Sequence, residues 1–117
     1  MRALTVRRPW AYAIIYLGKD VENRSWWTSY RGPLLIHAAG SAPRHDLLVP
    51  VKYSELVRGA ITGVVELYDC VRDAKSEWAE RGQWHWLLRD PRPLEPIRCQ
   101  GALGLWRPTA AQVPDSH

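Results

Sequence analysis

The sequence contains no phenylalanine, one methionine, two cysteines and three lysines among its 117 residues. Cys70 and Cys99 lack the spacing of a zinc site, and the four histidines are scattered, so we expect no metal and no other cofactor. No apolar run approaches the roughly 18 residues of a membrane span, and the N-terminus lacks the apolar core of a signal peptide. These absences predict a cytoplasmic protein without a membrane partner.

Arginine and tryptophan are present in quantity. Basic residues exceed acidic ones by 16 to 12, and 13 of the 16 are arginine. Arginine binds phosphate and guanine through its planar fork, so the excess suits an anionic partner such as nucleic acid. A GC-rich genome, which favours arginine codons, would explain the same composition without a function. Most of the seven tryptophans are expected in the core or in the wall of the fold.

A short helix is predicted over residues 9–17. Apolar side chains recur there at helical spacing, so one face can be buried, and Pro9 suits the first turn of a helix. Gly18 then stands where a helix C-terminus favours a residue that tolerates positive φ. Residues 3–6, before the helix, are predicted to form a short strand.

Residues 21–26 are predicted to be extended, which would place Glu22, Arg24 and Trp26 on one face. In one explanation of this surface, Glu22 and Arg24 form an ordinary ion pair at a strand edge and Trp26 belongs to the core. In the other, Lys19 and Arg24 bind phosphate or a base edge, Glu22 accepts from an exocyclic amine, and an aromatic ring stacks on the base. Local spacing leaves both explanations open.

Several sequence blocks share their order with one known family. They are Pro9-Trp10-Ala11, Gly18-Lys19-x-x-Glu22-x-Arg24-Ser25-Trp26, residues 30–38, Gly63-Val64-Val65-Glu66-Leu67 and Gly101-Ala102-Leu103-Gly104-Leu105-Trp106. Together they resemble the ASCH domain family, whose signature is G-x-K-x-x-E-x-R. The resemblance covers nearly the whole chain. One departure is that the first glycine of the signature falls on Leu17, while the glycine stands one place later.

The resemblance implies a fold and a partner. ASCH domains are similar to the PUA-like folds, which are small β-barrels with helices that often recognise RNA or modified bases. The expected class is therefore α+β, a single PUA-like β-barrel with two or three short helices over residues 1–108 and a C-terminal tail over residues 109–117. The expected partner is RNA or another single-stranded nucleic acid, with a nucleoside as a further ligand, while the oligomeric state is left open.

The resemblance also implies functions and site residues. A binding module would use a basic, tryptophan-lined pocket whose nucleic-acid-binding residues are Lys19, Glu22, Arg24, Trp26, Trp10, Arg31 and Arg8. The alternative is a metal-independent hydrolase, either a ribonuclease or an enzyme acting on N4-acylated cytidine, with Lys19, Glu22 and Glu66 as catalytic residues. Glu22 stands where the deacetylating members have a threonine nucleophile, so attack would need a water activated by a carboxylate. A protein-interaction module is the third hypothesis.

Glu66 lies in a strand predicted over residues 60–71, on a face with mostly apolar neighbours. A carboxylate is unfavourable there unless it is paired, hydrogen-bonded or directed into a wet pocket. Glu66 is therefore either the partner of a nearby arginine or a functional group, namely a general acid–base group or an acceptor that recognises a base. His37, inside the apolar run of residues 34–38, is expected in the core or in a pocket wall.

The remaining elements are predicted from turn-forming residues and from hydrophobic periodicity. A polar helix anchored by Trp78 is predicted over residues 73–82, and a strand over residues 84–88. Pro91 and Pro93 are expected to take the chain out of the sheet, because two prolines so close together lack ladder donors. Further predictions are a surface excursion over residues 39–52, a helical turn over residues 53–58, and last strands over residues 94–99 and 102–106.

Overall fold

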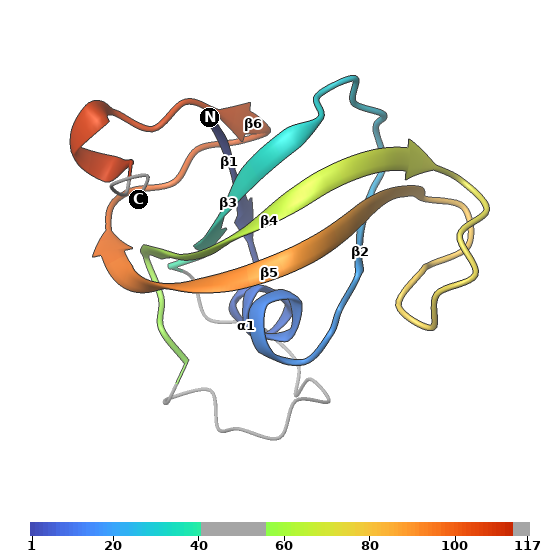
Figure 1. Ribbon diagram of the computed structural model, residues 1–117, viewed down its shortest axis with the longest axis horizontal. Helices are drawn as coiled ribbons and strands as arrows, with labels where there is room; N and C mark the ends of the chain where they lie inside the picture. The colour runs from blue at the N-terminus through green and yellow to red at the C-terminus, as the bar shows by residue number, and fades with distance from the viewer. Residues whose placement is uncertain (41–55, 114–117) are drawn as a thin grey trace.

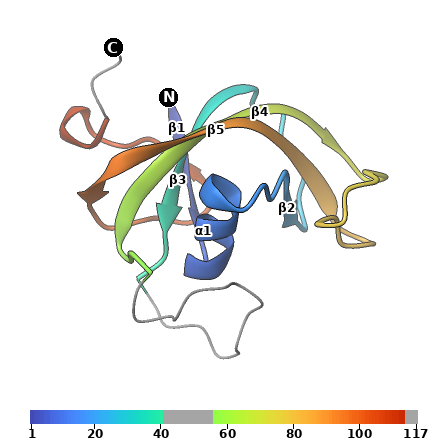
Figure 2. The ribbon, with the colours of Figure 1, turned by 60° about the horizontal axis from the view of Figure 1, so that its bottom comes forward.

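The computed structural model describes residues 1–40 and 56–113. Its strands form one sheet in the order β2-β5-β4-β3-β1-β6. They are β1 (Arg2–Val6), β2 (Val21–Arg24), β3 (Gly32–Ala38), β4 (Ala60–Val71), β5 (Trp84–Arg98) and β6 (Leu105–Trp106). Figure 1 shows the sheet curving around the helix α1 (Arg8–Tyr16), and the turned view in Figure 2 shows β4 and β5 arching over that helix.

β1 lies inside the sheet, where it pairs in parallel with β3 and antiparallel with β6. Leu4 and Val6 on one side of this strand are buried in the main core. The helix α1 begins directly afterwards, with a proline in its first turn, and it buries Ile14 and Ile15 against the concave face of the sheet. The predicted strand over residues 3–6 and the predicted helix over residues 9–17 are both confirmed.

The core has two parts, one on each face of the sheet. Trp86 is fully buried in the main cluster on the side of the helix, and Leu34 and Ile36 of β3 belong to the same cluster. Leu35 of β3 belongs to a smaller cluster, which Trp106 and neighbouring apolar residues cover. The prediction that residues 34–38 form a strand buried on both faces is therefore confirmed.

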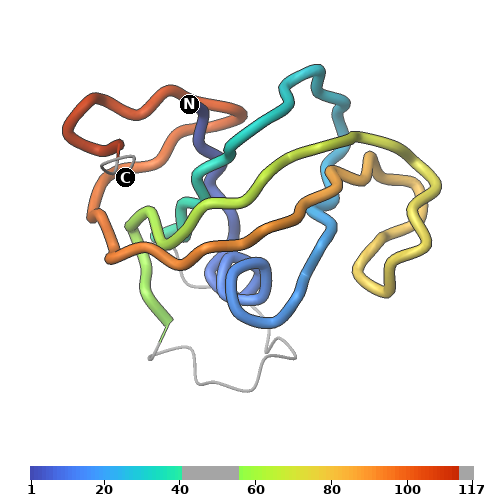
Figure 3. The backbone as a smooth tube through the Cα atoms, viewed as in Figure 1, coloured from blue at the N-terminus to red at the C-terminus, as the bar shows by residue number. Residues whose placement is uncertain are grey.

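The predicted helix over residues 73–82 is wrong, and the barrel has one α-helix in the described residues rather than two or three. Residues 72–83 form turns at the end of the β4–β5 pair (Figure 3). The Asn23 side chain donates to the carbonyl of Trp78 at 2.9 Å and accepts from the backbone N–H of Glu80 at 2.8 Å. These tertiary hydrogen bonds take up backbone groups that a helical ladder would need.

The prediction that Pro91 and Pro93 leave the sheet is also wrong, because β5 runs without a break from Trp84 to Arg98. β2 pairs with β5 only as far as Leu87, so the later part of β5 has a strand on one edge only. A proline without an N–H is tolerated at such an edge. Register shifts between β4 and β5 accompany this stretch, and the two last strands predicted separately are the end of β5 and the short β6.

The remaining segments are brief. The predicted excursion over residues 39–52 and helical turn over residues 53–58 lie mostly outside the described residues. In the predicted tail, Thr109 caps a 3-10 turn over Ala110–Gln112. No helix in the described part of the chain is long and apolar enough to cross a membrane.

Candidate functional site

The end of α1 directs the signature segment into the molecule. Gly18 has a φ of 74°, a conformation that glycine adopts without strain, so the glycine one place after the expected position makes the turn. The backbone N–H of Lys19 donates back to the carbonyl of Ala13 at 3.0 Å. The chain thereby turns back at the C-terminal end of α1 before it enters β2.

Lys19 is buried, with 4% of its surface exposed. Its ammonium donates to the carbonyl of Val21 and lies 3.8 Å from Glu22 Oε1. The same group lies 5.4 Å from the ring centroid of Trp10 and 5.7 Å from that of Trp78. Burial lowers the pKa of Lys19 from its usual value, and nearby carboxylates, Glu22 first among them, oppose that shift.

Glu22 joins Lys19 to Arg24. Arg24 Nε and Nη2 both lie 2.9 Å from Glu22 Oε2, and Nη2 also donates to the carbonyl of Thr5 at 3.0 Å. The Glu22 side chain is 9% exposed and that of Arg24 is 23% exposed. The hydrogen bond from Arg24 to Thr5 therefore ties β2 to β1, and the ion pair forms one side of an open hollow.

That hollow, which we call the signature cavity, has a volume of about 550 Å³. It lies where β1, the start of α1 and β2 come together with residues from neighbouring segments. Its lining residues are Thr5, Arg7, Trp10, Glu22, Asn23, Arg24, Ser25, Trp26, Ala39, Glu80 and Gln83. Trp26 is 37% exposed, so its assignment to the core is wrong, whereas the ion pair between Glu22 and Arg24 that belonged to the same explanation is confirmed. β2 ends at Arg24, before this tryptophan.

The charges lining the signature cavity balance. Two arginines, Arg7 and Arg24, face two carboxylates, Glu22 and Glu80. Amide and hydroxyl side chains complete the wall, so it offers hydrogen-bond donors and acceptors of several kinds. Such a wall suits a neutral, hydrogen-bonding ligand better than a multiply charged anion. The sequence-based expectation of a basic pocket is therefore not matched by the described lining.

Glu66 stands apart from the signature cavity. Its carboxylate accepts from Arg89 Nε at 3.1 Å and Nη2 at 2.6 Å, with side-chain exposures of 41% and 55%. Its neighbours Val65 and Leu67 point into the main core, while Tyr68 is exposed beside Arg89. The sequence pattern assigned Glu66 an apolar face because it assumed a regular alternation, which register shifts after Val64 and after Leu67 interrupt. Of the two explanations, the ion pair with an arginine is confirmed.

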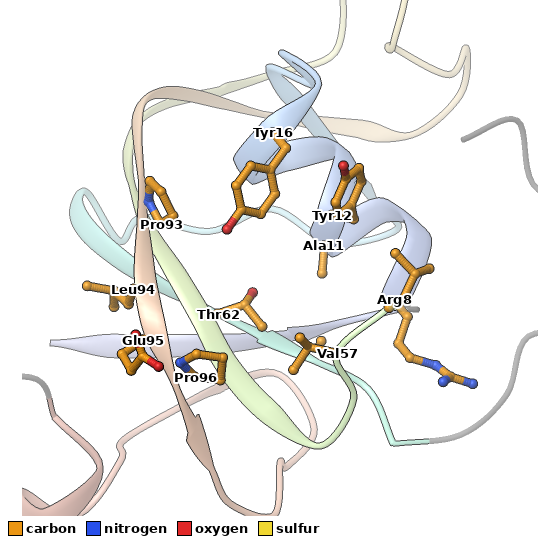
Figure 4. A pocket seen from close by; sticks show the side chains of 12 residues that line it. Arg8, Ala11, Tyr12, Tyr16, Val57, Thr62, Pro93, Leu94, Glu95 and Pro96 are labelled. Carbon is orange, nitrogen blue, oxygen red and sulfur yellow. The ribbon is translucent and has the colours of Figure 1, made fainter. Parts of the chain in front are cut away.

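Two further arginines proposed from the sequence lie elsewhere. Arg31 donates to the carbonyls of Thr28 and Tyr30, each at 2.8 Å, and so holds the turn before β3. Arg8 lines a different cavity of about 610 Å³ between α1 and the end of β5, where Figure 4 shows it near Tyr12. Neither arginine lines the signature cavity.

Several lining residues were not among the sequence-based candidates. Thr5 follows from simple alternation in β1, and Arg7, directly after the strand, has the same parity, opposite to the core residues Leu4 and Val6. Gln83, by contrast, arrives from a turn far away in the sequence, and no local signal predicts its position. Within the described residues, no group of three histidine, cysteine or acidic side chains could hold a metal ion.

Comparison with known proteins extends this description. The sequence model of the ASCH domain matches residues 4–98. The chain is also 32% identical over 84 residues to the proteins named Activating signal cointegrator 1 from Mus musculus and from Homo sapiens. In each case the match covers 58% of this chain and 14% of the relative, so the chain spans a small part of the curated relatives' length.

Proposed function

The chain belongs to the ASCH domain family, a PUA-like family of RNA-binding modules, and we propose that it binds single-stranded RNA through the signature cavity. One unpaired base would enter the cavity, and its edge would meet the mixed donors and acceptors of the wall. The observation that carries the proposal is that Trp10 of α1 lines one hollow together with Glu22, Arg24 and Trp26 of the signature segment.

The balanced lining supports a base as the bound group. Arg24 uses Nε and Nη2 for Glu22 and Thr5, so among the described contacts Nη1 still has two N–H donors for a ligand. Trp26 packs edge-on against Trp86 at 4.7 Å between ring centroids, which fixes its orientation. A fixed and partly exposed indole is a suitable surface for stacking on a base.

In this proposal Lys19 positions the residues of the site and does not contact the ligand itself. Its ammonium is buried and engaged with Val21 and Glu22, so it would act on a ligand through the position of Glu22 and of Trp10. The hydrolase alternative has less support. It needs Lys19 as the cation and either Glu22 or Glu66 as the carboxylate, whereas Lys19 does not line the signature cavity and Glu66 is paired with Arg89 on the outer surface.

The test compares two adjacent tryptophans. Trp26 lines the signature cavity, whereas Trp27 is 50% exposed and does not line it. Trp26→Ala should weaken the binding of a labelled single-stranded RNA on the order of tenfold or more, as expected for loss of a stacking side chain. Trp27→Ala should leave the affinity nearly unchanged. Fluorescence anisotropy at fixed salt measures both variants.

Two outcomes would contradict the proposal. Equal losses in both variants would show that the signature cavity is not the binding surface. Equal affinity for duplex and single-stranded RNA would show that the protein does not recognise an unpaired base. Separating the RNA after incubation tests the hydrolase alternative in the same samples. Products that disappear in Lys19→Ala, while the RNA still binds, would favour an enzyme.

A further inference from the structure

A second hollow adjoins the signature cavity. It has a volume of about 400 Å³ and is lined by β1, β3 and the glycine-flanked loop of residues 101–104. Thr5, Arg24 and Ala39 line both hollows, so the two are continuous across these residues. We call the second hollow the loop cavity.

We propose that the loop cavity holds the nucleotide next to the base bound in the signature cavity, and that it accepts this neighbour whatever its base. This inference rests on the proposed function. It adds that the site binds at least two successive nucleotides, and that the signature cavity discriminates among bases more strongly than the loop cavity does. Three features of the molecule support it: the shared arginine, the floor of the loop cavity and the exposed loop.

Arg24 lies where a connecting phosphodiester would pass, because it borders both hollows. Its Nε and Nη2 are held by Glu22 and Thr5, which fixes the plane of the guanidinium. A fixed guanidinium with donors to spare is suited to a phosphate oxygen. None of the described residues lining the loop cavity is acidic, so no carboxylate there opposes a phosphodiester.

At the floor of the loop cavity, the polar side chains of His37 and Thr5 already have hydrogen-bond partners within the fold. His37 is 2% exposed, and its Nε2 must donate to the carbonyl of Cys99 at 2.8 Å, since a carbonyl only accepts. In the neutral ring, Nδ1 then accepts from Thr5 Oγ1 at 3.2 Å. Thr5 Oγ1 in turn accepts from Trp106 Nε1 at 3.2 Å. Because these side chains already have hydrogen-bond partners, the loop cavity would bind a base without discriminating among the four bases.

The loop itself is close to this floor and open to solvent above it. A Cβ on Gly101 would lie 2.4 Å from Thr5 Oγ1 and 2.8 Å from the His37 ring, so only glycine allows this close approach. Two residues further on, Leu103 is 99% exposed at the rim of the loop cavity. An apolar side chain at the rim of a groove can pack on a ribose or on the face of a base. A bound nucleotide would thus give Leu103 the packing partner that it lacks among the described residues.

The test uses the four nucleosides and the sixteen dinucleoside monophosphates as ligands of the 15N-labelled chain of 117 residues. Chemical-shift titration reports the amides of Asn23 and Ser25 in the signature cavity separately from those of Gly101 and Gly104 in the loop. We expect nucleosides to shift the first set only. Dinucleoside monophosphates should shift both sets and bind at least fivefold tighter. Across the four bases, affinity should vary more at one position of the dinucleotide than at the other.

A variant in the loop gives a second readout. Leu103→Ser should weaken the binding of dinucleoside monophosphates about threefold to tenfold and leave nucleoside binding unchanged. Tyr68→Ser is the control, because Tyr68 is 40% exposed beside Arg89, away from both hollows. It should change neither affinity.

The possible failures are distinguishable. If nucleosides shift Asn23 and Ser25 but dinucleotides leave Gly101 and Gly104 unmoved, the second subsite is wrong while the proposed function stands. Equal discrimination at both positions would overturn the tolerance of the loop cavity. If no ligand shifts either set, the proposed function fails and this inference fails with it.

Discussion

Two glutamate–arginine pairs with the same chemistry occupy opposite settings in this molecule. In each, the arginine uses Nε and Nη2 on a single carboxylate oxygen: Arg24 on Glu22 Oε2, and Arg89 on Glu66 Oε2. The Glu22 side chain is 9% exposed and that of Glu66 is 41% exposed. The first pair borders the signature cavity, and the second lies on the outer surface beside Tyr68.

The difference teaches what burial adds to an ion pair. Water screens the outer pair and solvates either partner if the other is lost, so the pair contributes little. The inner pair has little access to water, and Glu22 also faces the buried ammonium of Lys19. Removing the shared carboxylate would leave two cations without their anion, which is the unfavourable way to break a buried pair.

The largest effect is therefore expected for Glu22→Gln. The free energy of unfolding should fall by about 3 kcal/mol, because Lys19 and Arg24 lose their common carboxylate. Urea denaturation followed by tryptophan fluorescence measures the change. Glu66→Gln is the matched control and should alter stability little. Similar losses in the two variants would contradict the distinction between the pairs.

The next effect concerns the shape of the cation. Arg24→Lys keeps the charge but cannot bond Glu22 and Thr5 together, so stability should fall by about 1.5 kcal/mol. RNA affinity should fall as well, because the substituted side chain loses the fixed donors at the cavity. Arg89→Lys, measured in the same two assays, should affect neither. A loss of RNA binding in Arg89→Lys would move the interface to the outer surface.

A smaller effect should appear in the pH dependence of stability. Burial lowers the pKa of Lys19 from its ordinary value of 10.5, so between the lowered pKa and 10.5 the unfolded chain binds more protons than the folded one. Stability then rises with pH in that window, by at most about 1.4 kcal/mol per pH unit. Measured relative to Lys19→Met, the unfolding free energy of the natural chain should increase as the pH approaches 10.5. A difference that falls with pH would contradict this assignment.

Salt should give the smallest effect and separate the pairs again. The outer pair is open to counterions, so any small loss in Glu66→Gln should vanish near 1 M NaCl. The loss in Glu22→Gln should largely persist there, since the side chains of Lys19 and Glu22 are 4% and 9% exposed and salt screens buried charges much less. For RNA binding, about two phosphate contacts would give a logarithmic salt slope between about −1 and −2. A much steeper slope would indicate a basic surface outside the signature cavity.

The sequence predicted the framework of the fold well where periodicity was strong. The strand over residues 60–71 and the helix near residues 9–17 are both present. It failed over residues 73–82, where hydrogen bonds from Asn23 replace a helical ladder, and at Pro91, which lies on a strand edge. Both failures have one cause, since each outcome depends on a segment distant in the sequence.

The candidate site shows the same division. Glu22, Arg24 and Trp26 were found from their alternation, and Trp10 from its place beside the signature. Glu80, which the sequence assigned to a helix, and Gln83 reach the signature cavity from the turns of residues 72–83, and the carboxylate of Glu80 helps to balance the two arginines. The sequence pattern placed Glu66 on an apolar face because it assumed a regular alternation, which register shifts interrupt.

By itself, then, the sequence determined which residues could form strands, a helix and a turn at Gly18, because those choices depend on side chains a few positions apart. Only the tertiary structure decided which glutamate–arginine pair would be buried. Burial depends on which strands become neighbours and in what register. The long-range pairing of β2 with β5 encloses Glu22, while Glu66 on β4 stays on the outer surface.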